Sequence, residues 1–499
     1  MQIFSFLLYA LLLANVLMKF FTNLLHVVPR VFNIADLMIT AILGLMFFAT
    51  GGRIKNFKSI LVLLFLFDFV AILGNFFNSE YLFPMVAFSQ FAMYNGPIIL
   101  FVFLANIPFR KVHIDKYSKL LYNLIYFQFI VGLLQIPVFL ATGQTEAIMG
   151  TFYHNAEQYS GFLLIGIFFL FSKSLNSPQF KQNYYIFIAS MLSLIVIIDN
   201  KASWLGIIIS MLYIFYKVGD ENFQVSKRFK YIILAGTMLT IGGYLITSFS
   251  QTTGKLEGLI TSIQEGMFNE IGKVKAYDNV FKAFDDHPHM LVFGAGLGNF
   301  YSRSSYTYYD PEYYGAVLSH SSRQTKRQLD RFKTESDKLR EKGKTLRTSN
   351  SMGGVIDKMN QEPFFAQYYK VPKLRVGSGQ VDNPFSSYNA LLGETGILGM
   401  ILYISIYIII LIKMNKMVRK YRKDTNIFPI AASGLGFMVY ILSVALYGQW
   451  IDSGRMVTIL WSLIALTFRY DLFVQWQKKF AYHQHIRQRQ EPKKTEIYS

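Results

Sequence analysis

Long apolar stretches recur along the chain and are separated by shorter polar segments. A helix needs about 20 apolar residues to cross the hydrocarbon core of a bilayer, and backbone amides within lipid must be hydrogen-bonded inside the helix. The pattern predicts an all-α, polytopic helical membrane protein with about twelve transmembrane helices. The expected spans are residues 3–21, 32–50, 59–77, 84–107, 120–141, 159–171, 184–198, 203–216, 231–248, 388–412, 427–447 and 456–474.

These spans divide the chain into four parts: residues 1–250 with the first nine spans, a long polar segment 251–387, residues 388–475 with the remaining spans, and a basic tail 476–499. Every second connecting segment is rich in lysine and arginine, and such segments are retained on the cytoplasmic side. The alternation predicts cytoplasmic termini and an extracytoplasmic loop at 251–387. The basic residues concerned are Arg53, Lys55, Lys58, Arg110, Lys111, Lys116, Lys119, Lys173, Lys181, Lys217, Lys227, Arg228, Lys230, Lys413, Lys416, Arg419, Lys420, Arg422 and Lys423.

The composition agrees with this interpretation. Charged residues make up 16% of the chain and hydrophobic residues 53%, whereas a soluble chain carries about a quarter charged residues. The net charge of +19 follows from the retention of lysine and arginine beside anionic lipid, so we expect no nucleic-acid partner. The chain has no cysteine, which excludes disulfides, thiolate metal sites and a cysteine nucleophile.

Two short segments on the predicted outer face carry polar side chains suited to a sugar or a phosphate. His154 and Asn155 precede the sixth span, and the alternative for Asn155 is to cap that helix. Lys201 lies in the tight turn between the seventh and eighth spans, where a cation suits a lipid-linked diphosphate. The alternative for Lys201 is an ion pair with Asp199.

Two longer segments lie at the ends of the polar loop. The first runs from Lys273 to Arg303 and contains Lys275, the cluster Asp285-Asp286-His287 with His289, and the glycine-rich run 293–300. Glycines at this spacing allow a tight turn or close backbone approach, and the acid–histidine cluster has a hydrated loop and a metal site as its alternatives. The second segment, 383–399, leads into the tenth span and contains Asn389 and Glu394. A carboxylate in an apolar helix is usually functional, and its alternative is a hydrogen bond to a neighbouring helix.

Three motifs resemble the O-antigen polymerase and ligase (Wzy-type) family of membrane glycosyltransferases. They are Gly150-Thr151-Phe152 with Asn155, the run Phe293-Gly294-Ala295-Gly296-Leu297-Gly298, and the run Glu394-Thr395-Gly396-Ile397-Leu398-Gly399. The order of the motifs and the place of the long loop, between the ninth and tenth of about twelve spans, also match the family. The resemblance excludes the charged insertion 321–348 and the tail after Trp476.

The resemblance implies a metal-independent reaction without a cofactor, at the outer face of the bacterial inner membrane. A sugar hydroxyl attacks the anomeric carbon of a glycan carried on polyprenyl diphosphate, so the reaction needs a base and cations. Lys201 and Lys273 stand where the family usually carries arginine. The candidate catalytic residues are His287, His289 and Glu394, and His154 is a further candidate base. The candidate diphosphate-binding residues are Lys201, Lys273, Lys275 and Arg303. The candidate substrate-binding residues are His154, Asn155, Gly294, Gly296 and Asn389.

Three functions remain open from the sequence. A polymerase joins lipid-linked repeat units, a ligase transfers finished glycan to lipid A core, and a transporter or flippase moves lipid-linked sugars. The ligase branch carries a His-Asn pair before the glutamate motif, where this chain has Phe385-Ser386-Ser387, which favours the polymerase. A transporter would show internal repeats and more charge within the spans than Asp36 and Asp68. The expected partners are lipid-linked oligosaccharides and the bilayer, with a chain-length regulator as a further candidate.

Overall fold

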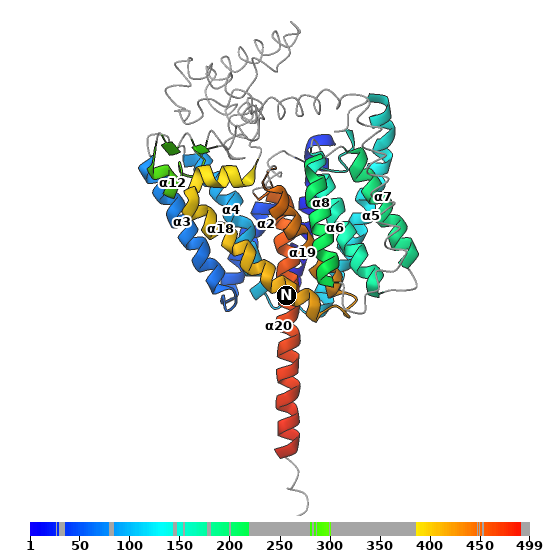
Figure 1. The fold of residues 1–499 in the computed structure, drawn as a ribbon. Coiled ribbons are helices and arrows are strands. Elements are labelled where there is room, and N and C mark those ends of the chain that lie inside the picture. Colours follow the sequence, from blue (N-terminus) through cyan, green and yellow to red (C-terminus); the bar gives the residue numbers. More distant parts are fainter. Residues whose placement is uncertain are drawn as a thin grey trace, which may run out of the picture.

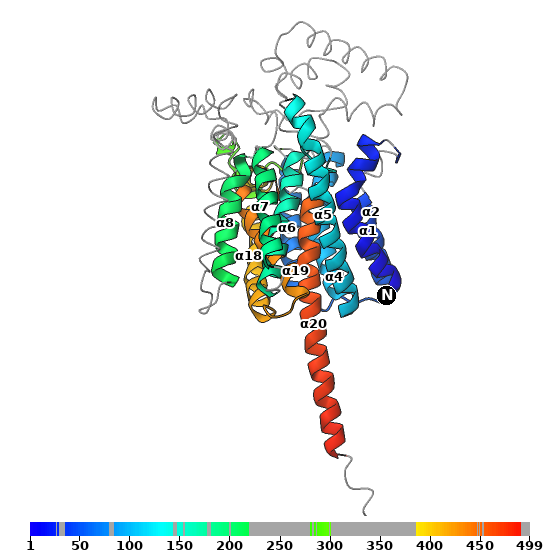
Figure 2. The same cartoon turned by 90° about the vertical axis from the view of Figure 1, so that its right-hand side faces the viewer.

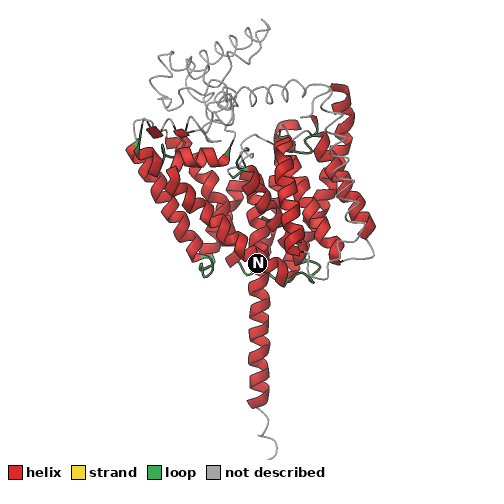
Figure 3. Cartoon of the chain, viewed as in Figure 1, coloured by secondary structure: helices red, strands yellow, loops and turns green. Residues whose placement is uncertain are grey.

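The structure is a computed structural model. It describes residues 1–25, 27–28, 35–78, 84–142, 147–152, 155–176, 181–198, 201–218, 280–281, 284–285, 287–298, 300, 386–446, 448, 450–451 and 454–490. Within these residues the chain forms helices and connecting loops, with no strand (Figure 3). The predicted all-α fold class is therefore confirmed for the part of the chain that is described.

The helices stand side by side in a bundle (Figures 1 and 2). Eight of the described helices, α1, α3, α4, α5, α6, α18, α19 and α20, contain a segment long and apolar enough to cross a membrane, and α2 is a shorter apolar helix. The fold is that of a helical membrane protein. The elements are α1 (Gln2–Lys19), η1 (Phe20–Leu24), α2 (Ala35–Ala49), α3 (Lys58–Phe77), α4 (Pro84–Asn106), α5 (Lys111–Thr142), α6 (Ala156–Asn176), α7 (Lys181–Ile197), α8 (Lys201–Val218), α12 (His289–Phe293), α18 (Ser387–Lys420), α19 (Ile427–Val444) and α20 (Gly454–Gln490).

Each predicted span coincides with one of these helices except 231–248, which lies outside the described residues together with most of the segment 251–387. The total of about twelve spans and the position of the long loop therefore stay predictions. Several helices are longer than predicted: α5 begins at Lys111, α18 continues to Lys420, and α20 continues to Gln490. Their extra turns are rich in charged residues, so hydropathy alone does not reveal them.

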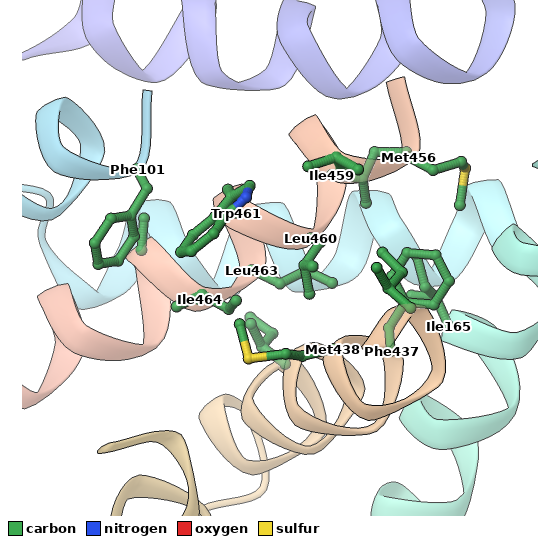
Figure 4. Close-up of a cluster of buried hydrophobic side chains, with 14 of the residues drawn as sticks. Phe101, Ile165, Phe437, Met438, Met456, Ile459, Leu460, Trp461, Leu463 and Ile464 are labelled. Atoms are coloured by element: carbon green, nitrogen blue, oxygen red, sulfur yellow. The ribbon is translucent and has the colours of Figure 1, made fainter. Parts of the chain in front are cut away.

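The core of the bundle is built around α19 and α20. The side chain of Trp461 on α20 is fully buried, and its ring centroid lies 5.2 Å from that of Phe101 on α4 and 5.2 Å from that of Tyr407 on α18. Met438 on α19 and Ile165 on α6 complete the same cluster (Figure 4). Other helices, such as α3, leave large apolar side chains exposed, among them Phe65 and Phe76. Such faces are suited to lipid, because exposed apolar side chains are unfavourable in water but not in hydrocarbon.

Basic segments that are far apart in sequence meet at one end of the bundle, which we call the basic end. The Asn106 Oδ1 atom after α4 accepts hydrogen bonds from the backbone N–H groups of Lys55 and Asn56, both at 3.0 Å. Lys413 lies over the ring of Phe57. Asn176 at the end of α6 donates to the carbonyl oxygen of Arg422 at 2.8 Å.

Helix α20 leaves the bundle at the basic end and projects away from it (Figures 1 and 2). The carboxylate of Asp471 on α20 pairs there with Lys420 and accepts a hydrogen bond of 2.6 Å from the Tyr421 hydroxyl. Beyond this pair the side chains of Trp476 and Phe480 are exposed and stack on each other. Because α3 starts at the basic end, its last residue reaches the opposite end, where α12 and the start of α18 lie (Figure 1).

Candidate functional site

The second motif forms a tight turn, which we call the glycine loop (residues 294–298). It follows α12 directly, and Gly294, Gly296 and Gly298 adopt φ angles of 71°, 91° and 78°. Residues with a Cβ atom rarely adopt such angles, so glycine is the residue suited to all three positions. The turn points the backbone N–H groups of Ala295, Gly296 and Gly298 toward α18.

Those N–H groups bind the third motif, because α18 is interrupted there. Gly396 has φ 65° and ψ −174°, which breaks the helix. An unbroken helix would use the carbonyl groups of Gly393 and Glu394 for its own hydrogen bonds. Here they accept instead from the N–H groups of Ala295, at 2.8 Å, and Gly296, at 2.9 Å. The break in α18 and the glycine loop are therefore two halves of one contact.

The backbones approach too closely for side chains. A Cβ atom on Gly294 would lie 2.3 Å from the carbonyl carbon and oxygen of Glu394, and one on Gly396 would lie 2.3 Å from the carbonyl oxygen of Val292. The last turn of α3 closes the other side, where a Cβ atom on Gly74 would lie 2.5 Å from the carbonyl oxygen of Phe293. This packing shows that Gly294 shapes the loop, as expected from its residue type.

Glu394 is the buried carboxylate of this contact. Its side chain is 0% exposed. The Oε1 atom accepts a hydrogen bond of 2.8 Å from the N–H group of Gly298, and the Oε2 atom accepts one of 3.2 Å from the hydroxyl of Tyr94 on α4. Tyr403 in turn donates to the carbonyl oxygen of Tyr94 at 3.0 Å. The carboxylate on α18 therefore ties the glycine loop to the neighbouring helix α4, which is the alternative role that the sequence offered.

Beside this contact, a histidine stands at the surface. His289 begins α12, its side chain is exposed, and its Nε2 atom lies 3.1 Å from the Oδ1 atom of Asn78 at the end of α3. His287 is half-buried, and its ring centroid lies 6.0 Å from that of His289. Of the predicted catalytic residues, the structure thus brings His289, His287 and Glu394 to the same end of the bundle.

The start of α18 is fixed to the segment that follows α19. The hydroxyl oxygen of Ser387 accepts hydrogen bonds from the N–H groups of Trp450, at 2.7 Å, and Ile451, at 3.0 Å. Ser386 caps the helix by accepting from the N–H group of Asn389 at 3.1 Å. The Asn389 side chain is 3% exposed, and its Oδ1 atom has no hydrogen-bond partner among the described residues. This buried acceptor keeps Asn389 a candidate for substrate binding.

The first motif lies elsewhere, in what we call the Gly150 loop (residues 149–152). The Oε1 atom of Gln135 on α5 accepts from the N–H groups of Met149 and Gly150 at 2.9 and 2.8 Å, and its Nε2 atom donates to the Gly150 carbonyl at 2.9 Å. Gln128 accepts from the N–H group of Thr151 at 3.0 Å. Neutral amides thus hold this loop against α5.

The remaining predicted residues divide into two groups. Asn155 accepts from the N–H group of Gln158 at 2.9 Å, which is the capping role considered as its alternative. Lys201 is the first residue of α8, but the structure does not describe its side chain. Four candidates lie outside the described residues and stay predictions: His154, Lys273, Lys275 and Arg303.

Two other acids lie within the bundle. Asp68 accepts a hydrogen bond of 2.8 Å from the side chain of Asn95 on the neighbouring helix. Asp36 is buried, and the charge of Arg455, also buried, attracts it. Both acids therefore have structural partners. In the part of the chain that the structure describes, no group of three or more histidine, cysteine, aspartate or glutamate residues is placed to hold a metal ion.

Sequence reasoning did not single out Asn78 or Tyr94. Asn78 directly follows an apolar span, where an asparagine has an ordinary role at the end of a helix, and it does donate to the carbonyl of Gly74 at 2.8 Å. Tyr94 precedes Asn95 within a mostly apolar span that also contains Ser89 and Gln90. These polar residues are the local signal of a buried contact.

Comparison with known proteins adds no relative: no protein-family model matches the chain, and no curated protein matches it.

Proposed function

We propose that the protein is a membrane glycosyltransferase that joins oligosaccharide repeat units carried on polyprenyl diphosphate, as a surface-polysaccharide or O-antigen polymerase. The observation that carries the proposal is the contact between two of the three motifs. The glycine loop and the break in α18 are separated by most of the polar segment 251–387, yet they share backbone and carboxylate hydrogen bonds. Motifs that resemble one family and also form one contact support a common function.

The proposed reaction places three demands on the protein. A base takes the proton of the attacking sugar hydroxyl, cations stabilise the leaving diphosphate, and buried polar groups orient the sugars. His289 is exposed beside the glycine loop, and Asn389 has a buried acceptor without a partner in the described residues. Lys201, Lys273, Lys275 and Arg303 are the proposed cations. No step requires a metal ion or a cofactor.

The polymerase is favoured over the ligase by the start of α18. In place of the His-Asn pair of the ligase branch, this chain has Ser386 and Ser387, and both hydroxyl groups hold the backbone in place. These hydroxyls are therefore committed to structure and do not replace the missing histidine. We further propose that the protein lies in a bacterial inner membrane with the basic end in the cytoplasm and the opposite end outside.

The test is a reconstitution. Purified protein in liposomes receives a labelled polyprenyl-diphosphate-linked repeat unit, and the products are separated by size. A ladder of multiples of the repeat unit supports the polymerase. Transfer of glycan to added lipid A core without a ladder points to the ligase, and movement of the label across the bilayer without a new glycosidic bond points to a transporter. Either of these outcomes would overturn the proposal.

The proposed cations give the first prediction. Lys201→Ala and Lys273→Ala should each lower the rate of polymerisation about a hundredfold, because each removes a charge from the departing diphosphate. The matched control is Lys119→Ala, which removes a lysine near the basic end. The ladder assay is read alongside the amount of protein in the membrane. Wild-type rates in both site variants would remove these lysines from the site.

A further inference from the structure

The orientation of the Asn78 side chain is fixed by its own hydrogen bonds. Its Nδ2 atom donates to the carbonyl oxygen of Gly74 at 2.8 Å and to that of Gly294 at 3.3 Å. Exchanging the amide nitrogen and oxygen would set an oxygen against two carbonyl oxygens. Asn78 is also 3% exposed, so water does not compete freely for these groups. The Oδ1 atom must therefore face His289.

That orientation decides where the proton of His289 resides. The Oδ1 atom of an amide only accepts hydrogen bonds, and it lies 3.1 Å from the Nε2 atom of His289. The Nε2 atom must therefore carry the hydrogen. A neutral imidazole has one N–H group, so its Nδ1 atom keeps a lone pair that can take up a proton. Phe77 packs against the same ring, with a centroid distance of 6.1 Å, and supports it from α3.

The other candidate bases are less suitable. Glu394 is fully buried, and both of its oxygens already accept hydrogen bonds, from the N–H group of Gly298 and the hydroxyl of Tyr94. Reaching a sugar would break the contact that holds the glycine loop. His287 is half-buried, and among the described residues no side chain hydrogen-bonds to its ring. His289 alone of the three combines exposure with a defined tautomer.

We propose that His289 is the proton acceptor of the glycosyl transfer and that Asn78 is a positioning residue that holds it in the Nε2–H tautomer, an inference that rests on the proposed function. The O–H bond of the acceptor sugar breaks, and its proton passes to Nδ1 of His289. The sugar oxygen bonds to the anomeric carbon of the donor. The bond from that carbon to the diphosphate breaks, and its electron pair leaves with the diphosphate. The imidazolium then releases its proton to water.

The rate should depend on pH in a defined direction. An imidazolium cannot accept a proton, so the rate of the wild-type protein should fall in acid, where the base is protonated, and should level off at higher pH. The described ionisable groups around His289 are Asp285 and His287 on the preceding segment and Glu394 on α18. The last two turns of α3 carry none.

Two variants test the assignment in the ladder assay. His289→Gln should lower the high-pH plateau of kcat about a hundredfold and should remove the decline at low pH. Asn78→Ala should keep that decline, because the histidine remains, but should lower the plateau about tenfold with little change in KM. The control is Phe76→Ala, an exposed residue in the same turn of α3, which should keep both the plateau and the decline.

A second measurement does not depend on activity. Nitrogen-15 NMR of the wild-type protein labelled at histidine, with His289→Gln to assign the signal, should show Nε2 protonated and Nδ1 bare at high pH. A wild-type protein that makes no ladder would refute the proposed function, and the NMR spectrum would still test the tautomer. A wild-type ladder with an unchanged rate and pH profile in His289→Gln would overturn this inference alone. So would an Nδ1–H tautomer.

Discussion

The glycine loop and the Gly150 loop solve the same problem with different chemistry. Each contains glycine with positive φ and donates from the backbone to a side-chain oxygen on a helix, through two N–H groups in the Gly150 loop and one in the glycine loop. In the Gly150 loop the acceptor belongs to Gln135, whose amide also donates back to the loop. In the glycine loop the acceptor is the carboxylate of Glu394, which only accepts. An amide therefore closes a loop completely, whereas a carboxylate needs donors on every side.

The difference indicates which loop serves as framework only. A neutral, fully paired amide is the least costly way to fix a loop inside a bundle, and a buried carboxylate is expensive. The Gly150 loop lies against α5 and, in the described residues, brings no histidine with it. The glycine loop lies beside Asn78 and His289. Resemblance to a family motif is thus shared by both loops, but the proposed base lies beside only the glycine loop.

The largest effect is expected from Gly294→Ala. The new Cβ atom would lie 2.3 Å from the backbone of Glu394, and the φ angle of 71° is itself unfavourable for alanine. We expect the free energy of unfolding to fall by roughly 4 kcal/mol. The measurement is the fraction of detergent-solubilised protein that stays monodisperse after heating.

The matched control for that change is Gly51→Ala. Gly51 has a φ angle of 74°, but nothing lies within 4 Å of its Cβ position. It should cost about 1 kcal/mol, which is the backbone strain alone. Equal losses in both variants would show that the close approach between the glycine loop and α18 does not hold the protein together.

A smaller loss is expected from Glu394→Leu. The N–H group of Gly298 and the hydroxyl of Tyr94 would lose a buried acceptor, at a cost of about 3 kcal/mol in total. The same heating assay measures it. Retained stability in this variant would mean that the carboxylate does not link the loop to α4, and the comparison between the two loops would fail.

Gln135→Glu places a carboxylate in the Gly150 loop. The variant keeps an acceptor for Met149 and Gly150 but turns a second oxygen toward the carbonyl of Gly150, where the amide now donates. We expect a loss of about 2 kcal/mol at neutral pH. The loss should shrink in acid, because the protonated carboxyl group regains a donor. A loss that does not change with pH would contradict this explanation.

The smallest effect is expected from the converse exchange, Glu394→Gln. One amide oxygen can still accept from Gly298, and the hydroxyl of Tyr94 can rotate to accept from the new amide group. The loss should stay below about 1 kcal/mol. Together, Glu394→Gln and Gln135→Glu test whether an amide can replace the carboxylate in the glycine loop and whether a carboxylate fails to replace the amide in the Gly150 loop. A large loss here would show that the negative charge itself is needed.

Most of the described helices were predictable, because a span must be both long and apolar, and no other part of a chain combines these properties. The ends of α5 and α20 were not predictable from hydropathy. Their outer turns contain Lys111 and Lys478, which lie beyond the apolar stretch. Helical structure continues there because the backbone hydrogen bonds of a helix do not depend on apolar side chains.

The candidate site was predictable in its parts but not in its assembly. Resemblance singled out the glycine loop and Glu394, and the presence of a carboxylate in an apolar span supported Glu394 independently. The partners Asn78 and Tyr94 lie 211 and 300 positions away from the residues they bond. An asparagine at the end of a helix, or a tyrosine within a span, carries no local pattern that specifies such a distant contact.

The projecting part of α20 offers a built-in spacer for topology measurements. From Asp471 to Gln490 the helix extends roughly 28 Å past the ion pair with Lys420. A fluorescent or enzymatic reporter fused to the end of α20 would lie away from the bundle and would not disturb the packed helices. The activity of the reporter would then show which compartment contains the basic end. The same rod gives a fixed arm for spectroscopic distance probes, with Phe480 as an exposed attachment point.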